Sequence, residues 1–485
     1  MATTLDDTSH KLLQLGGLVQ ATIAQFVTLR HSHGEGKEGT LPSKPLFNAQ
    51  RTLLAAAGMI TELVSEPQSR LLEVSSQYFE ARALHIAAGH RIPDLIAKNG
   101  PRGLGAETLA SHTGIESRKL SRLMRCLCSI HIFKEIDEDV FANNGISESL
   151  VGNEFLRSYI LLFGLDLYSS SDYLPRYLDD PVRGHSYAVD TTPWQDAVNT
   201  SKPRWEWLEE KPPARDIRDG WSGADGAVSA YPGVFGPELN SVKAGIESGE
   251  GEEKPISRPE HAIFGQAMVG GGRVFGQAHL YDFPWASLGP ATVVDVGGGA
   301  GGFCLQLSHH FPDLRFIIQD RAPVLELAKS EVWPAENPGA LATGRVEFVP
   351  HNFFESNPSP GAAVYWLRYI LHDWSDDYCV RILEAIRPAM SPKSRILICD
   401  QVMNTTRGCS ELPGAPEPLP SNWGYYARYS HQRDLAMMSI INGIERKPAE
   451  LRNLATRAGL RLNRIWDCRS QVGLVELVLP DSEIV

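Results

Sequence analysis

From about residue 290 the chain alternates short apolar runs with stretches in which apolar residues recur at helical spacing. Apolar runs bounded by turn residues predict buried strands, and the helical spacing predicts helices between them. Such alternation indicates a mostly parallel sheet covered on both faces. The last two strands are joined by a tight connection, so we expect them to pair antiparallel. The expected strands are 291–297, 314–320, 345–352, 362–371, 394–403, 460–469 and 471–479, with helices at 302–310, 322–330, 376–390 and 448–460.

The N-terminal part of the chain is expected to be mainly helical. Residues 1–30 carry leucines and valine near helical spacing, and residues 31–46 have the Gly, Ser, Lys and Pro content of a linker. Further on, a helix at 106–112, a turn at Gly114, a helix at 117–129 and a hairpin-like tail form a winged-helix shape. This shape is also found in DNA-binding proteins, but acids near its arginines and a net charge of −12 oppose binding to nucleic acid.

These patterns divide the chain into three parts. We expect a helical N-terminal domain at 1–165 with its winged helix at about 70–150, a helical connection at 166–290, and a ligand-binding α/β domain at 291–485. Within the connection, residues 200–258 are rich in Gly, Pro, Ser and acidic residues. This composition is typical of a lid, a surface insertion or a disordered segment.

Composition limits the compartment and the partners. The 485-residue chain has seven scattered cysteines without a Cys-x-x-Cys pair, which indicates neither a zinc site nor a disulfide framework. The N-terminus lacks a basic segment followed by an apolar core, and no apolar run approaches the length needed to span a membrane. We therefore expect a soluble cytoplasmic protein with no metal, nucleic acid or membrane partner.

A glycine-rich loop follows the first strand of the α/β part. In VVDVGGGAGGF, Gly297, Gly299 and Gly302 satisfy G-x-G-x-x-G, and Asp320 ends the next strand, where it can bind a ribose diol. These features suit both NAD and S-adenosylmethionine. Asp295 favours the second, because a buried acid repels a pyrophosphate but attracts an ammonium and a sulfonium. A carboxylate that only ties the loop by accepting backbone N–H bonds is the alternative.

His372 lies in LRYILHDWSDD, where the apolar residues predict a short buried strand that ends at the histidine. Ligands of open α/β sheets gather at the carboxyl ends of the strands. A histidine there is either a catalytic group or a hydrogen-bonded structural residue, and its position alone does not decide between them.

The winged-helix block, VDVGGGAGG, Asp320 and HDWSDD together resemble the plant caffeic acid-type and fungal O-methyltransferases, over about residues 70–170 and 260–480. The resemblance implies an α/β fold, the class I methyltransferase Rossmann-like sheet with an antiparallel last strand, plus an N-terminal winged-helix domain that forms a homodimer. It also implies transfer of a methyl group from S-adenosylmethionine to a hydroxyl, phenolic in type, of a small aromatic or secondary metabolite, with release of S-adenosylhomocysteine.

The resemblance further assigns roles to residues. His372 is the general base, oriented by Glu445 of NGIERK and by Asp400, which stands where the plant enzymes usually have Glu. Asn352 replaces the family's adenine-binding Asp, a loss of about 1 kcal/mol for one hydrogen bond. The implied cofactor-binding residues are Asp295, Gly297, Gly299, Gly302, Asp320, Arg321, Asn352, Phe353 and Arg368. Residues that could line a pocket for a flat ring, or equally form core, are Trp423, Tyr425, Tyr426, Met437 and Met438.

Two other functions stay open at this point. Some fungal proteins of this fold use S-adenosylmethionine without methyl transfer, to promote pericyclic or dehydration steps. A set of His372, Asp400 and Glu445 favours methyl transfer, because a pericyclase needs no such base. The second alternative is a non-catalytic regulator that binds a partner through residues 200–258. A methylated product formed with S-adenosylhomocysteine would separate these functions.

Overall fold

The computed structural model describes residues 6–32, 41–220 and 229–484. The chain forms two compact units, which we describe separately. The sheet unit comprises Met1–Ser65, Val274–Met438 and Asn442–Val485, and the helical unit comprises Glu66–Arg273 and Ser439–Ile441. Residues 1–65 thus cluster with the sheet, whereas the sequence pattern had grouped them with the helical N-terminal part. The boundaries of functional domains stay a prediction.

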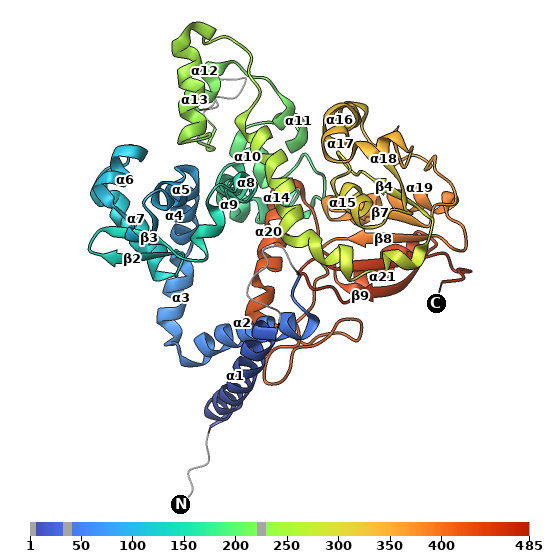
Figure 1. The fold of residues 1–485 in the computed structure, drawn as a ribbon, viewed down its shortest axis with the longest axis horizontal. Helices are drawn as coiled ribbons and strands as arrows, with labels where there is room; N and C mark the ends of the chain where they lie inside the picture. The colour runs from blue at the N-terminus through green and yellow to red at the C-terminus, as the bar shows by residue number, and fades with distance from the viewer. Residues whose placement is uncertain (1–5, 33–40, 221–228, 485) are drawn as a thin grey trace, which may run out of the picture. The chain divides into compact units, whose positions relative to one another are not determined.

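The sheet unit is built on seven strands in the order β6-β5-β4-β7-β8-β10-β9 (Figure 1). Neighbours from β6 to β8 pair parallel, and β10 pairs antiparallel with both β8 and β9, as the sequence predicted. Strand order reverses between β4 and β7, which is where open α/β sheets bind their ligands. The strands are β4 (Thr292–Val296), β5 (Arg315–Asp320), β6 (Val346–Pro350), β7 (Val364–Arg368), β8 (Arg395–Cys399), β9 (Arg461–Trp466) and β10 (Leu474–Val478).

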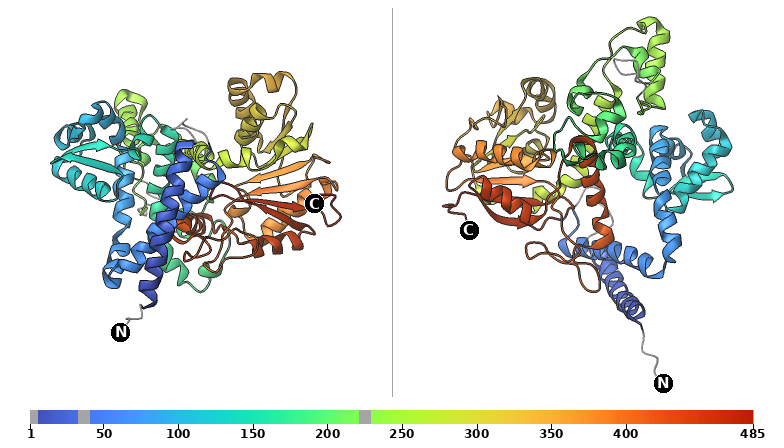
Figure 2. Two further views of the ribbon diagram at one scale, coloured as in Figure 1. Left: turned by 60° about the horizontal axis from the view of Figure 1, so that its bottom comes forward. Right: turned by 180° about the vertical axis from the view of Figure 1, so that it is seen from behind.

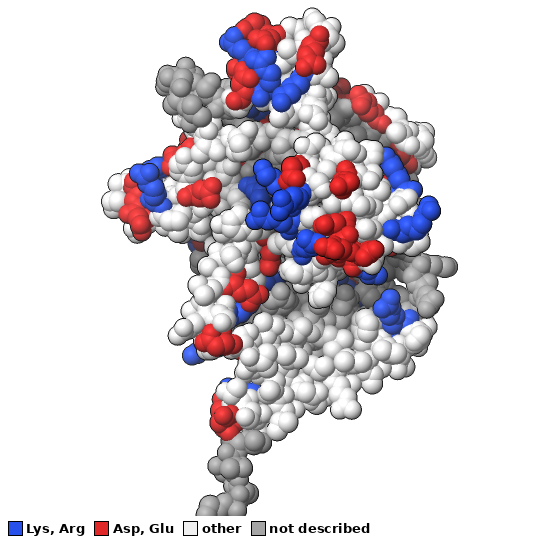
Figure 3. Space-filling model, turned by 90° about the vertical axis from the view of Figure 1, so that its left-hand side faces the viewer, with Lys and Arg blue, Asp and Glu red and all other residues white. Residues whose placement is uncertain are grey.

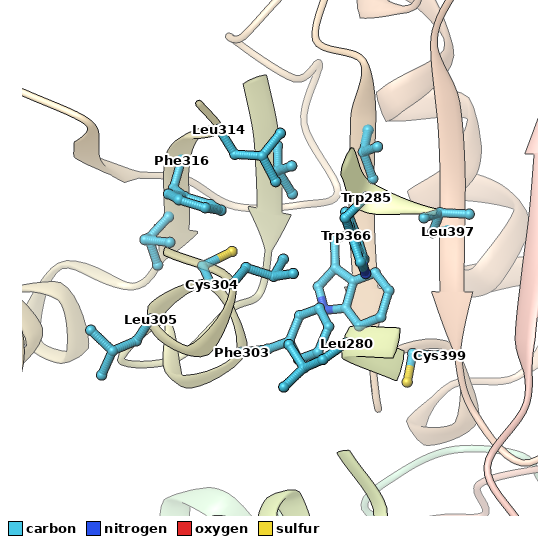
Figure 4. Close-up of a cluster of buried hydrophobic side chains, with 14 of the residues drawn as sticks. Leu280, Trp285, Phe303, Cys304, Leu305, Leu314, Phe316, Trp366, Leu397 and Cys399 are labelled. Atoms are coloured by element: carbon cyan, nitrogen blue, oxygen red, sulfur yellow. The ribbon is translucent and has the colours of Figure 1, made fainter. Parts of the chain in front are cut away.

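Two hydrophobic clusters cover the two faces of this sheet. Because side chains alternate along a strand, β7 contributes Trp366 to one cluster and Tyr365 and Leu367 to the other. On the first face, the rings of Trp366 and Phe303 stack with their centroids 4.3 Å apart (Figure 4). The packing fixes the ends of β4 and β7 relative to the helix that follows the glycine loop. The main helices are α15 (Gly302–His310), α16 (Ala322–Leu327), α19 (Asp376–Ile386), α20 (Arg428–Ile441) and α21 (Pro448–Arg457).

The first two helices also belong to the sheet unit. Helices α1 (Asp7–Ser32) and α2 (Lys44–Val64) pack against each other (Figure 2), and a small core joins them to Leu419 and Trp423. By length and composition α1 could cross a membrane, so the expectation that no apolar run reaches that length was wrong. A core helix of a soluble protein or a signal sequence passes the same test. Half of the predicted linker at 31–46, residues 33–40, lies outside the described part of the chain.

The helical unit contains the helices and the hairpin expected from the sequence. Helix α6 (Ala106–Thr113) ends at Gly114, whose φ of 72° is left-handed, and α7 (Ser117–Ser129) follows. Strands β2 (Phe133–Asp137) and β3 (Val140–Asn143) form the hairpin, with the short β1 (Leu104–Gly105) beside β3. The other helices include α3 (Pro67–Ser76), α4 (Tyr78–Gly89), α5 (Ile92–Ala97), α8 (Glu154–Gly164), α9 (Asp166–Leu178), α10 (Pro193–Val198) and α14 (Pro259–Tyr281), the last of which continues into the sheet unit.

Arg125 of the winged-helix block is paired with two acidic residues. Arg125 of α7 lies 2.9 Å from Glu135 and 3.0 Å from Asp139. On the face drawn in Figure 3, Lys and Arg side chains lie beside Asp and Glu side chains. A phosphate backbone would therefore meet mixed charge on this face, which does not favour nucleic-acid binding.

The described part of the segment at 200–258 has regular secondary structure. It forms α11 (Arg204–Glu209), α12 (Ala214–Arg218) and α13 (Pro237–Gly245). Trp207 is fully buried with its ring 5.4 Å from that of Trp194, and Tyr231 is buried as well. Disorder is therefore wrong for this described part, because buried aromatic rings anchor it. Residues 221–228 lie outside the described residues.

Candidate active site

The glycine loop after β4 is packed tightly on one side and open on the other. A Cβ on Gly298 would lie 2.4 Å from the Asp295 carboxyl carbon, and one on Gly297, at φ 70°, would lie 2.7 Å from Ile370. Nothing lies within 4 Å of a Cβ added to Gly299 or Gly302. Glycine thus lets the loop close against the sheet while its open side offers bare backbone to a ligand.

Asp320 joins the glycine loop to the end of β5. Its Oδ2 accepts a hydrogen bond from the Gly299 N–H at 2.8 Å, and its Oδ1 accepts one from the Arg321 N–H at 2.7 Å. A carboxylate oxygen can accept two hydrogen bonds, so both oxygens keep acceptor capacity for a ribose diol. Arg321 contributes its backbone N–H to this arrangement.

Asp295 is 3% exposed beneath the loop. Burial raises its pKa to about 7, against a hydrogen bond with Cys304 and the positive charge of Arg368. A carboxyl group in this state gains most from a cation, because the cation stabilises the ionised form that burial disfavours. Asp295 therefore suits a positively charged ligand group.

Arg368 ends β7 and presents a second charge near the loop. Its guanidinium carbon lies 5.5 Å from the centre of the Phe303 ring and 5.2 Å from that of Tyr369. Nε and Nη2 are buried and have no hydrogen-bond partner among the described residues. Two guanidinium donors are thus available to an anionic or carbonyl group.

Asn352 and Phe353 follow β6. Asn352 is exposed, and its Oδ1 accepts a hydrogen bond from the Phe354 N–H at 3.2 Å, which closes a local turn. Phe353 lies 3.6 Å from the Cβ position of Gly297, so its ring borders the glycine loop. Phe353 is thus placed to contact a ligand in the loop, whereas Asn352 already has a structural partner.

The sequence pattern predicted a strand up to residue 371, directly before His372. The observed strand ends earlier. β7 ends at Arg368, Tyr369 has a left-handed φ of 55°, and His372 lies in a 3-10 turn at Leu371–Asp373. The Tyr369 N–H donates to Asp400 Oδ1 at 3.0 Å and to the Cys399 carbonyl at 3.2 Å. These bonds stabilise a backbone conformation that a tyrosine rarely adopts and end the strand four residues before His372.

The His372 ring is buried and held from two sides. Nδ1 lies 2.9 Å from Glu445 Oε1, and Nε2 lies 3.3 Å from Asp373 Oδ1. The Ile444 N–H donates to the His372 carbonyl at 2.8 Å. A glutamate on Nδ1 fixes a tautomer in which Nδ1 carries hydrogen and Nε2 is the basic nitrogen.

The carboxylates determine the charge of His372. Burial lowers the pKa of the ring, but Glu445, Asp373 and Asp400 together outweigh burial and raise the pKa to about 9. Burial opposes ionisation of Glu445, yet His372 and Arg433 lower the pKa of that carboxyl. Burial raises the pKa of Asp400 to about 6. The pKa of His372 lies well above the ordinary histidine value of 6.5.

Asp400 acts differently from Glu445. Its Oδ1 accepts the Tyr369 N–H, and it affects His372 through its charge. Two residues that sequence reasoning missed support Glu445: Asp434 Oδ1 accepts the Glu445 N–H at 2.9 Å, and Arg433 Nη2 lies 3.9 Å from Glu445 Oε1. Both come from α20, and only the folded chain shows which of its charged residues approach the site.

The residues expected to line a pocket or form core lie in different surroundings. Trp423 and Tyr426 pack in the core formed with α1 and α2, and Tyr425 lies against Gly58 of α2. Met437 and Met438 are half-buried on α20. Among the described residues, no group of three or more His, Cys, Asp or Glu is arranged to hold a metal ion.

Comparison with known proteins decides the family. A family model described as an O-methyltransferase domain matches residues 252–461, and one described as an O-methyltransferase dimerisation domain matches residues 72–153. The chain is 53% identical over 478 residues to O-methyltransferase tpcA of Aspergillus fumigatus, which covers 97% of this chain and 96% of that protein. The chain belongs to the O-methyltransferase family.

Solved structures agree with this O-methyltransferase fold. CalO1, a methyltransferase of calicheamicin biosynthesis solved with S-adenosylhomocysteine, is 26% identical with a TM-score of 0.57, over 86% of this chain and 99% of that one. A pericyclic reaction enzyme is 21% identical with a TM-score of 0.63, over 95% and 99%, which shows a shared fold. The cofactor of this O-methyltransferase is S-adenosylmethionine, and the glycine loop, Asp320 and Asp295 offer groups that fit it. Membership of an enzyme family removes the support for a non-catalytic regulator.

Proposed function

We propose that this O-methyltransferase methylates a phenolic hydroxyl of a small aromatic secondary metabolite, with His372 as general base. The observation that carries the proposal is the hydrogen bond from His372 Nδ1 to the buried Glu445, which directs the basic Nε2 away from that partner. Phenols have a pKa near 10, so a base is needed to form the more nucleophilic phenolate at neutral pH.

Residues at the ends of β4, β5 and β7 bind different groups of the cofactor. When bound, S-adenosylmethionine supplies a methyl group that its sulfonium charge already activates. Asp320 accepts hydrogen bonds from the ribose hydroxyls, and the open side of Gly299 and Gly302 accommodates the ligand against the backbone. Asp295 stabilises positive charge, and Arg368 donates hydrogen bonds to a carboxylate.

His372 acts on the acceptor side of the site. Nε2 takes the proton of the hydroxyl as the new oxygen–carbon bond forms, and Glu445 stabilises the resulting imidazolium through Nδ1–H. Asp373 and Asp400 add to this stabilisation by their charge. Holding the oxygen in line with the methyl group supplies much of the remaining acceleration through orientation.

The test is His372→Gln, assayed by the mass of the methylated product and by cofactor affinity. We expect the rate to fall roughly 10²–10⁴-fold at neutral pH, the range for general base catalysis. Affinity for S-adenosylmethionine should stay near wild type, because the imidazole contacts the acceptor. Raising the pH toward the pKa of the phenol should restore part of the rate.

A matched control is His279→Gln, because His279 is also fully buried and its Nε2 lies 3.1 Å from the Val472 carbonyl. That variant should lower the melting temperature without changing the pH dependence of the remaining rate. Equal rates of wild type and His372→Gln at pH 7, per folded enzyme, would show that His372 is structural.

A pericyclase or dehydratase is the second candidate, supported by the pericyclic reaction enzyme that shares the fold. The buried His372–Glu445 pair favours methyl transfer over a pericyclic step, because a pericyclic step needs no general base. Formation of S-adenosylhomocysteine in proportion to product supports transfer, whereas converted substrate with unchanged cofactor would support the pericyclase.

We also propose that the enzyme is a cytoplasmic homodimer that binds neither membranes nor nucleic acid. The match to a dimerisation domain at residues 72–153 supports dimer formation, and seven free cysteines suit a reducing compartment. A monomeric mass by light scattering at micromolar concentration, with activity intact, would contradict the dimer. Recovery of the enzyme with membranes after cell fractionation would contradict the location.

A further inference from the structure

Gln401 is a buried polar residue beside the catalytic groups. It directly follows Asp400, it is 1% exposed, and neither Oε1 nor Nε2 has a hydrogen-bond partner among the described residues. Nearly all buried side-chain amides in proteins are hydrogen-bonded, because an unpaired buried amide lowers stability. The Gln401 amide is therefore available to hydrogen-bond a ligand or an ordered water.

The backbone around Gln401 places it next to the base. A hydrogen bond from the Gln401 backbone N–H lowers the pKa of Glu445, the residue that holds His372. Single β-bridges pair Gln401 with Val472 and Val402 with Arg446, the neighbour of Glu445. The segment that carries Gln401 is thus attached directly to the loop that orients His372.

A second buried glutamine of the sheet unit provides a comparison, because its amide is hydrogen-bonded within the protein. Gln319 is also 1% exposed, but its Nε2 donates to Asn357 at 3.1 Å and to Ser359 at 3.0 Å, and its Oε1 accepts from Asn357 at 2.8 Å. Residue type and burial are therefore the same, and only the hydrogen bonding differs. Burial in the sheet does not by itself explain why residue 401 is polar.

We propose that the Gln401 amide binds a second oxygen of the methyl acceptor, so that the acceptor is an aromatic ring with at least two oxygen functions. One is the hydroxyl that loses its proton to His372, and the other is a carbonyl or a further hydroxyl. The amide can donate to either group and can accept from a hydroxyl, whereas an apolar ring would leave both amide groups unpaired. This specificity role rests on the proposed methyl transfer.

The test compares Gln401→Leu with Gln319→Leu on acceptors that differ by one oxygen. Suitable pairs are 1,3-dihydroxynaphthalene with 1-naphthol, and 4-hydroxyacetophenone with 4-ethylphenol, each assayed for kcat/KM with S-adenosylmethionine. Wild type should prefer the member with the additional oxygen by about 10-fold or more, the range for a neutral hydrogen bond in a buried site. Gln401→Leu should remove that preference, mainly by raising KM for the member with the additional oxygen.

The melting temperature provides a second readout. Gln401→Leu should keep or raise it, because the variant removes an unpaired buried amide, whereas Gln319→Leu should lower it. A Gln401→Leu enzyme that keeps the preference, or that loses as much melting temperature as Gln319→Leu, would overturn the proposal while the proposed function stands. A wild-type enzyme that methylates no member of these pairs but still binds the cofactor would contradict the proposed function itself.

Discussion

Replacing Glu445 by Gln removes one charge beside His372 and keeps the shape of the side chain. The amide can still accept a hydrogen bond from His372 Nδ1, which lies 2.9 Å from Glu445 Oε1. The charge it removes is the first among those that raise the pKa of His372. We therefore expect the pKa of His372 to fall by at least one unit in Glu445→Gln, because burial then acts against a weaker opposing charge.

The size of the expected effect on the rate follows from the difference between the ordinary pKa of histidine, 6.5, and the value of about 9 in this site. At 1.36 kcal/mol per unit, the net effect of burial and the three carboxylates favours the imidazolium by about 3 kcal/mol. Each unit by which the pKa falls in the variant would lower the rate on the alkaline plateau by up to roughly tenfold. The fraction of neutral base at pH 7 rises in the variant, which offsets part of the loss at that pH.

The same shift predicts how stability depends on pH. Because the folded pKa of His372 is raised above its unfolded value, the charged pair stabilises the fold fully below pH 6.5, and this contribution is lost as pH rises to about 9. The melting temperature of Glu445→Gln should therefore differ most from that of wild type at pH 6 and least at pH 9.

The assay is the pH profile of kcat/KM from pH 6 to 10, together with melting temperatures over the same range. Glu476→Gln is the matched control, because Glu476 is 1% exposed and pairs with Arg395 at 3.2 Å within the sheet. It should lower stability without moving the kinetic midpoint. A midpoint in Glu445→Gln equal to that of wild type would refute the assignment of Glu445 as the charge that sets the pKa of His372.

Two predictions concern the cofactor loop. Asp320→Ala removes the acceptor of the Gly299 and Arg321 N–H groups and the two proposed hydrogen bonds to the ribose. Calorimetry should therefore show S-adenosylmethionine affinity weaker by about 2–3 kcal/mol. Unchanged affinity would contradict the ribose assignment. Gly298→Ala places a Cβ 2.4 Å from the Asp295 carboxyl carbon and should weaken cofactor binding at least tenfold. Gly265→Ala meets no atom within 4 Å and lies outside the cofactor loop, so it is the control for an added methyl group, and it should leave cofactor affinity unchanged.

The sheet could be predicted from sequence because its signals are local. Continuous apolar runs between turn residues marked the strands, and the observed helices at Gly302–His310 and Ser117–Ser129 agree with the expected ranges. The glycine loop and Asp320 were likewise predictable, since a tight turn after a strand needs glycine at positive φ.

The catalytic geometry could be predicted only in part, because it depends on contacts between distant segments. The apolar residues 369–371 look like strand, and only the bond from the Tyr369 N–H to Asp400 shows why β7 stops at Arg368. The support of Glu445 by Asp434 likewise arises where α20 meets the loop before α21. No periodicity in the sequence encodes either contact.

The raised pKa of His372 depends on carboxylates from distant parts of the sequence, and it changes what the proposed role as a base requires. A base of pKa 7 would be half neutral at pH 7 but would take a proton from a phenol of pKa near 10 at a cost of about 4 kcal/mol. A pKa of about 9 makes that proton transfer much less uphill, but it also leaves only a small fraction of His372 neutral at pH 7. The two effects nearly cancel at pH 7, so the advantage of the carboxylates grows as pH rises toward 9. A carboxylate-rich site of this kind therefore favours weakly acidic phenols, for which the smaller uphill step matters most.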